Sequence, residues 1–130
     1  MSERKIMIVD DDKVFLAELK DLLLSCGYNI VDFSDSRRAF LATTVIKPDI
    51  ILLDLKMDGL NGLQFADKVR RSSVLRNTPI IIMTGFNIDC REYPYTMDSY
   101  GIDRCLRKPF HILDLVAAIE GVRDEVPESG

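Results

Sequence analysis

Short apolar runs alternate along the chain with longer segments whose apolar residues recur at helical spacing. The runs are rich in strand-forming residues, so we expect strands at 6–9, 28–33, 49–54, 80–84 and 104–107. The segment after the first run places four apolar residues on one helical face: Phe15, Leu19, Leu22 and Leu23. We expect Asp12 to cap this helix and Gly27 to end it.

Three further segments fit helices. Ser34 or Ser36 is expected to open the second, which Pro48 stops. The third follows a turn at Asp58-Gly59, and the last begins near Pro109, a residue that suits a first helical turn. Residues 85–101 are less regular because Pro94 interrupts any long helix there.

Strands that alternate with helices indicate an α/β fold, a (βα)₅ doubly wound parallel sheet in a single domain. The first, third and fourth runs are continuously apolar, as central strands are, whereas the second and fifth contain charged residues typical of edges. This favours the flavodoxin-like strand order 2-1-3-4-5. We expect the domain to span 1–124 and a tail or linker to span 125–130.

Composition narrows the classes of function. The chain has 130 residues, 47% of them hydrophobic, and a formal net charge of −4. An acidic surface disfavours direct contact with nucleic acid, and the apolar runs are far shorter than the roughly 20 residues of a membrane span. No signal peptide is visible, and the odd cysteine count (Cys26, Cys90, Cys105) has no ligand-like spacing, so we expect free thiols in a reducing cytoplasm.

Chemically active side chains stand where the predicted strands end. The first strand runs into Asp10 and Asp11, the third ends at Asp54, the fourth ends at Thr84, and Lys108 follows the fifth. Parallel strands with right-handed crossovers bring these ends to one side of the sheet, where ligands bind. Each residue alone has an ordinary explanation as a cap, strand residue or surface charge. Their joint occurrence at four strand ends favours a shared site.

Clustered carboxylates repel one another unless a cation neutralises them. Hard oxygen ligands suit Mg²⁺ (Mn²⁺ is also possible), which binds one or two carboxylates together with phosphate oxygens. An aspartate can attack phosphorus to form an acyl phosphate. A nearby ammonium group would then stabilise the charge on the transferred group.

Four sequence stretches resemble the receiver domains of two-component response regulators: residues 8–12, 54–62, 83–85 and 106–110. The resemblance covers residues 5 to about 123. It implies that Asp54 is the phosphoacceptor, Asp11 a direct Mg²⁺ ligand, and Asp10 a support for the metal that often acts through water. It further implies that the Lys56 carbonyl is a metal ligand.

The resemblance implies that Thr84 follows the phosphoryl group and that Lys108 pairs with it, with a cis Lys108–Pro109 bond. A histidine kinase or a histidine phosphotransfer protein would supply the phosphoryl group, and an output domain or protein would respond. Such a domain is not an enzyme but a signalling phosphoacceptor that assists its own phosphorylation and dephosphorylation. Direct contact with nucleic acid or membrane is not expected of it.

Several positions depart from the family pattern. Asp58 stands where proline is usual, which adds negative charge near the site, and Cys105 replaces the usual aromatic switch residue. We interpret Cys105 as a small buried hydrophobe. The stretch between Thr84 and Lys108 is slightly long, so we expect the fourth helix to be short or displaced. Lys56 and Phe86 provide no good acceptor for a hydrolytic water, which predicts slow self-dephosphorylation.

Three other functions have sequence requirements that can be compared with this chain. A phosphatase of the haloacid dehalogenase type would need a second aspartate at the position of Lys56. A flavin-binding module would need a Ser/Thr/Gly-rich phosphate loop after the first strand, where this chain has three aspartates. A receiver-like interaction domain that works without phosphorylation is compatible with Cys105 and the altered fourth helix, although the intact acidic set argues against it.

Overall fold

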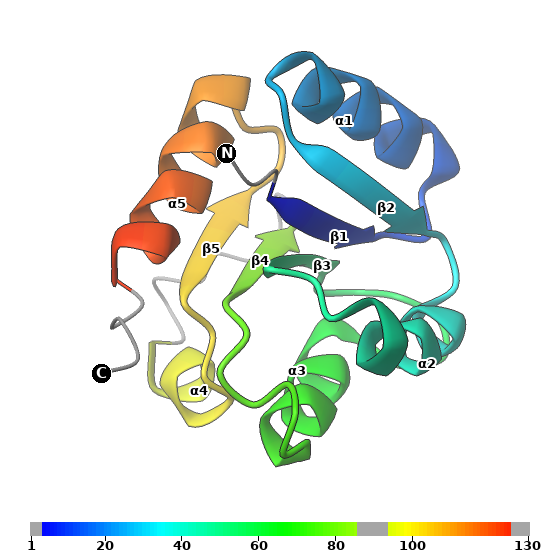
Figure 1. Cartoon of the computed structure of the whole chain (residues 1–130), viewed down its shortest axis with the longest axis vertical. Helices are drawn as coiled ribbons and strands as arrows, with labels where there is room; N and C mark the ends of the chain where they lie inside the picture. The colour runs from blue at the N-terminus through cyan, green and yellow to red at the C-terminus, as the bar shows by residue number, and fades with distance from the viewer. Residues whose placement is uncertain (1–3, 86–93, 126–130) are drawn as a thin grey trace.

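The computed structural model describes residues 4–85 and 94–125, which form a central sheet between two layers of helices (Figure 1). The strands of the described part are β1 (Lys5–Val9), β2 (Asn29–Phe33), β3 (Ile50–Asp54), β4 (Ile80–Thr84) and β5 (Arg104–Arg107). All pairs are parallel and the order is β2-β1-β3-β4-β5. The predicted fold class and strand order are therefore confirmed.

The helices lie on both faces of the sheet. They are α1 (Lys13–Ser25), α2 (Ser36–Ile46), α3 (Gly62–Arg71), α4 (Pro94–Ser99) and α5 (Ile112–Glu125). Helices α1 and α5 cover one face, and α2, α3 and α4 lie on the other (Figure 1). Right-handed crossovers in a doubly wound sheet produce this division, because the chain changes face where the strand order reverses.

The core consists of two apolar clusters separated by the sheet. Alternate residues of the central strands face opposite layers, so Ile8 and Leu52 pack on the α1 and α5 side while Val9 and Leu53 pack on the α2 and α3 side. Strands β1, β3 and β4 are apolar at successive positions because both of their faces are buried. The edge strands β2 and β5 are only partly buried, which explains their charged residues.

Local structure corrects several expectations. The buried stripe of α1 contains Leu16, whereas Leu22, expected on that stripe, is 47% exposed. Asp12 caps α1 as predicted, by accepting hydrogen bonds from two backbone N–H groups. Helix α2 begins at Ser36, one of the two residues predicted to open it, and its N-cap is Asp35.

The cysteine prediction was wrong in part. Cys26 is a free, exposed thiol, but Cys105 is disulfide-bonded. Cys105 also packs partly buried against the cluster beneath α2 and α3, as expected of a small hydrophobe. The remaining cysteine, Cys90, lies outside the described residues.

The fourth helix is short, as predicted. It has six residues and starts at Pro94, which fits a first turn because the missing N–H has no helical partner there. Helix α5 runs to Glu125, the first residue of the predicted tail, and the rest of that tail lies outside the described residues. No helix within the described ranges combines the length and apolar character needed to span a membrane.

One arginine ties the loops together at the sheet edge where the strands begin. The Arg70 guanidinium donates to the carbonyl oxygens of Arg76 and Thr78 at 2.8 Å and to that of Gly101 at 2.6 Å. It also lies 3.3 Å from a carboxylate oxygen of Asp103, and burial lowers its pKa. These contacts join the end of α3 to the turns before β4 and β5.

Replacing Arg70 with methionine should therefore destabilise the fold. Three carbonyls would lose charge-assisted hydrogen bonds, so we expect the free energy of unfolding to fall by about 2–3 kcal/mol. Urea denaturation followed by circular dichroism measures this change. The matched variant Arg71→Met removes only an exposed i,i+4 ion pair with Asp67 and should cost about 0.5 kcal/mol or less. Equal losses in the two variants would contradict this role of Arg70.

Candidate metal and phosphoryl site

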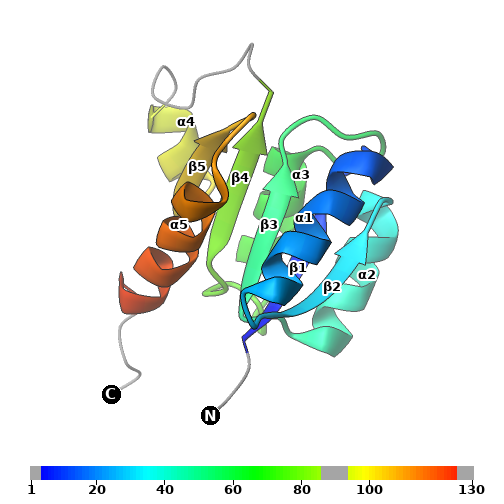
Figure 2. The ribbon, with the colours of Figure 1, turned by 90° about the horizontal axis from the view of Figure 1, so that it is seen from above.

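The carboxyl ends of the strands converge on one edge of the sheet, opposite the edge where β1 begins (Figure 2). Asp54 and Thr84 are the last residues of β3 and β4, while Asp10 and Lys108 directly follow β1 and β5. The register pairs Asp54 with Met83 and Thr84 with Arg107, so these ends are level across three strands. The parallel topology thus gathers residues that are far apart in the sequence.

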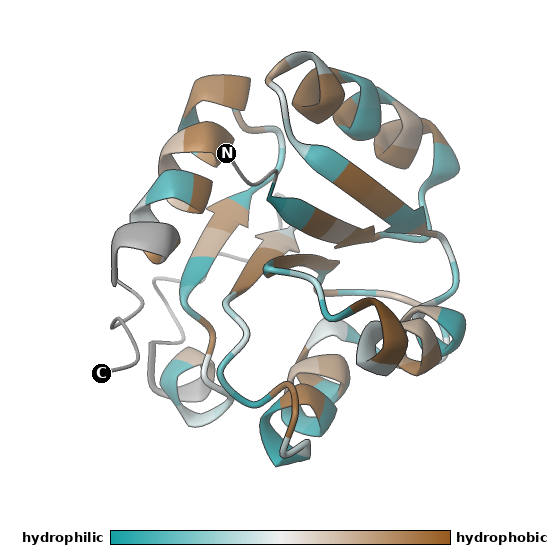
Figure 3. Cartoon of the chain, in the orientation of Figure 1, coloured by the Kyte–Doolittle hydropathy of each residue, from teal (hydrophilic) through white to brown (hydrophobic). Residues whose placement is uncertain are grey.

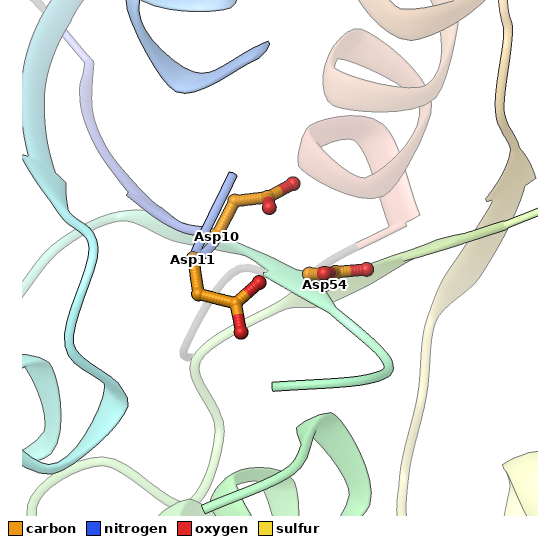
Figure 4. A group of neighbouring side chains, drawn as sticks. All are labelled: Asp10, Asp11 and Asp54. Carbon is orange, nitrogen blue, oxygen red and sulfur yellow. The ribbon is translucent and has the colours of Figure 1, made fainter. Parts of the chain in front are cut away.

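Three carboxylates share one small space at this edge. Asp10, Asp11 and Asp54 each offer an oxygen atom, and these atoms all lie within 4.8 Å of one another (Figure 4). Asp10 is completely buried and Asp54 is 8% exposed, whereas Asp11 is open to solvent. The cluster therefore has a buried floor and one side that a ligand can approach.

Both oxygens of Asp10 are already engaged by the protein. Oδ1 accepts a hydrogen bond from the Asp12 N–H at 2.9 Å, and Oδ2 lies 2.6 Å from Lys108 Nζ. The same ammonium group is 3.6 Å from Asp54 Oδ1. Lys108 thus spans two of the acids, and Asp10 is held as part of the frame.

The position of Lys108 depends on an aromatic ring that sequence reasoning did not assign to the site. Lys108 Nζ lies 4.0 Å from the centroid of the Phe15 ring, in cation–π geometry. Phe15 in turn meets Phe110 edge to face, with centroids 6.0 Å apart. The Lys108–Pro109 peptide bond is cis, as the resemblance implied. Phe15 appeared in the sequence only as an apolar position of a helix.

Burial and crowding change the ionisation of Asp54. Its pKa is raised from 3.8 to about 6, first by desolvation and then by the negative charge of Asp10, with a smaller contribution from Asp11. The Lys108 ammonium acts in the opposite direction but does not outweigh these effects. The ionised form, which Asp54 needs to act as a nucleophile, is therefore less favourable than in an ordinary carboxyl group, and further positive charge nearby would stabilise it.

The loop after β3 is held from two sides. The Asp58 N–H donates to Asp11 Oδ2 at 3.2 Å, which directs one acid of the cluster toward this loop. On the other side, the buried Ser36 hydroxyl donates to the Asp58 carbonyl at 3.0 Å and accepts from the Leu60 N–H at 2.8 Å. The sequence indicated Ser36 only as a possible first residue of the second helix, and its contact with a loop 22 residues away carried no local signal.

Gly62 lets α3 begin directly beside the phosphoacceptor candidate. A Cβ atom at this position would lie 2.7 Å from the Asp54 carbonyl oxygen and 3.0 Å from Leu55 Cα. Asn61 caps the helix in a capping box with Gln64. Glycine is needed here for close packing of the helix on the end of β3.

The donor set suits a hard divalent cation. A hollow of about 260 Å³ lies beside the cluster and is lined by Asp11, Lys56, Met57, Asp58 and Asn61. Oxygen donors of this kind match Mg²⁺, which needs few protein ligands and keeps several waters. Burial is the main cause of the raised pKa of Asp54, and the negative charge of Asp10 adds to it, so a nearby cation would stabilise the ionised carboxylate. The residues present therefore fit the ion that the sequence predicts.

The remaining predicted residues occupy the same edge. Thr84 is completely buried, and its Oγ1 lies 3.5 Å from the carbonyl oxygen of Leu106, while the Thr84 carbonyl accepts from the Lys108 N–H at 2.7 Å. Lys56 is exposed and borders the hollow beside Asp11. Phe86, named in the prediction of slow dephosphorylation, lies outside the described residues.

Comparison with known proteins indicates a family for this chain. The model of the response regulator receiver domain matches residues 6–120. The sensory transduction protein BceR of Halalkalibacterium halodurans is 29% identical over 121 residues, which is 91% of this chain and 49% of that protein. The transcriptional regulatory protein PdtaR of Mycobacterium tuberculosis is 30% identical over 90% of this chain and 55% of its own length. The chain thus spans about half the length of these curated relatives.

Solved structures share the fold along almost their entire length. The chemotaxis response regulator CheY4 of Vibrio cholerae superposes with a TM-score of 0.84 at 25% identity, covering 93% of this chain and 99% of that one. A CheY-like receiver domain protein from Methanospirillum hungatei gives a TM-score of 0.87 at 24% identity and covers 99% and 100%. Because the identity to the Methanospirillum hungatei protein is only 24%, this similarity indicates a shared fold and nothing more.

The crowding of acids predicts that Asp54→Asn stabilises the metal-free protein at neutral pH. The folded-state pKa of about 6 exceeds the ordinary value of 3.8, so ionised Asp54 opposes folding above pH 6 and has no such effect below pH 4. We expect a gain of about 1–2 kcal/mol at pH 8 in EDTA that vanishes toward pH 4, measured by urea denaturation. The exposed control Asp21→Asn should show no such pH-dependent gain. Destabilisation by Asp54→Asn at pH 8 would contradict the electrostatic account.

Proposed function

The chain belongs to the response regulator receiver family of two-component signalling, and on that premise we propose that it accepts a phosphoryl group on Asp54. The observation that carries the proposal is the position of this carboxylate at the end of β3, with the Lys108 ammonium 3.6 Å away and two further acids beside it. This arrangement places the carboxylate nucleophile of Asp54 beside a positive charge. We assign the function to residues 1–124.

The proposed reaction uses groups of this chain in distinct roles. A carboxylate oxygen of Asp54 attacks the phosphorus of a phosphohistidine and forms an acyl phosphate, while the donor imidazole nitrogen leaves with the electrons of the broken P–N bond. Lys108 places a fixed positive charge beside the developing negative charge on the phosphoryl oxygens. The Phe15 ring and Asp10 hold this ammonium in place.

The ion Mg²⁺ or Mn²⁺ would be held by four groups: the carboxylates of Asp10, Asp11 and Asp54 and the backbone carbonyl of Lys56. When bound, the cation neutralises the clustered carboxylates and stabilises negative charge on the transferring group. Asp11 is the exposed acid and the one beside the hollow, which supports direct ligation. Asp10 has both oxygens engaged by protein donors, which supports an indirect role.

Thr84 is the residue proposed to report phosphorylation. Its hydroxyl would donate to a phosphoryl oxygen, and its present neighbour is the Leu106 carbonyl at 3.5 Å. Because Cys105, the residue before Leu106 in β5, stands where the family usually has an aromatic residue, the change would pass to β5 without that ring. The receiver would then alter its binding to an output domain or protein.

Exposed apolar residues at the rim suggest where the phosphoryl donor docks. Val14 in the first turn of α1 is 71% exposed, and Leu113 in the first turn of α5 is 69% exposed. The contact of Phe15 with Phe110 shows that these two segments adjoin. We propose that a histidine kinase or histidine phosphotransfer protein binds here, in the cytoplasm, and that this domain itself contacts neither nucleic acid nor membrane.

Incubation with acetyl phosphate and Mg²⁺, followed by intact-mass measurement, tests the proposed function. We expect the wild-type chain to gain one phosphoryl group and Asp54→Asn to gain none, because the nucleophile is lost. The neighbouring Asp58→Asn serves as the matched control and should still be modified. An unmodified wild-type chain, or a phosphorylated Asp54→Asn variant, would overturn the assignment and favour an interaction domain that works without phosphorylation.

The lifetime of the phosphorylated state gives a second test. Lys56 borders the site but cannot accept a hydrogen bond from a water, so we expect slow hydrolysis of the acyl phosphate. Lys56→Glu supplies an acceptor and should shorten the half-life several-fold, measured by the decay of the phosphorylated mass. Arg76→Glu makes the same charge change in an exposed position outside the site and should leave the half-life unaltered. A wild-type half-life as short as that of the fastest chemotaxis receivers would refute slow hydrolysis.

A further inference from the structure

A second hollow lies on the α2 and α3 face, away from the phosphoacceptor. Its volume is about 400 Å³, within the range of ligand-binding pockets, and its lining residues are Arg37, Phe40, Leu41, Leu60 and Lys68. They come from α2, from the loop after β3 and from α3, which lie side by side in Figure 1. We call this hollow the α2–α3 groove.

The groove has an apolar floor that continues onto the surface. Phe40 packs edge to face on the buried Phe65, with ring centroids 5.6 Å apart, so its position is fixed by the core. Leu41 is 72% exposed, and Val45, one turn further along α2, is 82% exposed. In Figure 3 the helix in this place carries brown, hydrophobic stretches. Scattered apolar residues are ordinary on a surface, but an apolar ridge that leads into a hollow is typical of a binding surface.

Two cations stand at the sides of this floor. Lys68 Nζ lies 5.6 Å from the centroid of the Phe40 ring, and Arg37 lines the groove from the first turn of α2. Both side chains are exposed, and among the described residues neither has a carboxylate within ion-pair distance. In a chain with a net charge of −4, this is a local positive site that the protein itself does not neutralise.

An apolar floor flanked by two cations favours some classes of binding partner over others. Nucleic acid binds rows of cations along its phosphates and gains little from an apolar floor with two charges. A helix that presents large aliphatic side chains on one face and carboxylates beside them would fill the hollow and pair with both cations. We propose that the α2–α3 groove binds an acidic amphipathic helix of a partner protein. This goes beyond the proposed function and does not depend on phosphorylation of Asp54.

A synthetic peptide can test the groove directly. The probe is a fluorescein-labelled helix with leucines at i, i+3, i+4 and i+7 spacing and glutamates at the flanking positions, and fluorescence anisotropy with the full chain measures its binding. We expect saturable binding, and we expect Leu41→Glu to weaken it at least about tenfold through lost apolar contact and repulsion. Val74→Glu, at a residue that is 62% exposed and outside the groove lining, is the matched control and should bind as wild type.

Reversal of charge supplies the decisive comparison. The double variant Arg37→Glu, Lys68→Glu should lose the glutamate peptide and bind the same peptide with lysine in place of glutamate. Circular dichroism confirms that each variant is folded. Equal affinity of the wild type for both peptides, or equal loss in Val74→Glu, would overturn the proposal. Self-association of the chain that Leu41→Glu abolishes in the absence of peptide would also overturn it, because a second copy would then be the occupant.

Discussion

Mutual repulsion among three carboxylates at the ends of β1 and β3 is the constraint around which this structure is arranged. Parallel strands bring Asp10, Asp11 and Asp54 together, because Asp54 is the last residue of β3 and the other two acids directly follow β1. Lys108 offsets part of the repulsion, but burial and the negative charge of Asp10 still raise the pKa of Asp54 to about 6. In the function that we propose, a divalent cation relieves this repulsion and supports the binding of a phosphoryl group.

The surrounding contacts keep this unfavourable cluster in place. The loop after β3 is fastened to Asp11 by the Asp58 N–H and to α2 by Ser36, and Gly62 allows α3 to begin against the Asp54 backbone. The same loop supplies Leu60 to the α2–α3 groove. The loop after β3 thus contacts both the acidic site and the α2–α3 groove, so a movement of this loop at one of them can displace residues at the other.

Much of this arrangement could be predicted from the sequence, because the burial of a strand or helix determines the spacing of its apolar residues. Continuous apolar runs identified the central strands, and charged residues within the second and fifth runs identified the edge strands. Pro94 indicated that the fourth helix is short. Leu22 was wrongly expected to be buried because α1 has more apolar residues than its buried face holds. The start of α2 was left open between Ser34 and Ser36, and its cap, Asp35, stands between these two equally suitable serines. The contacts of Phe15 with Lys108 and of Ser36 with Asp58 depend on tertiary structure and leave no short-range signal.

The ionisation of Asp54 tests the central claim most directly. An NMR titration of its side-chain carboxyl carbon, first in EDTA and then with saturating Mg²⁺, reports the pKa in each state. The account predicts a pKa near 6 without metal and a clear fall when Mg²⁺ binds. An ordinary carboxyl pKa in EDTA, or a raised pKa that Mg²⁺ leaves unchanged, would contradict it.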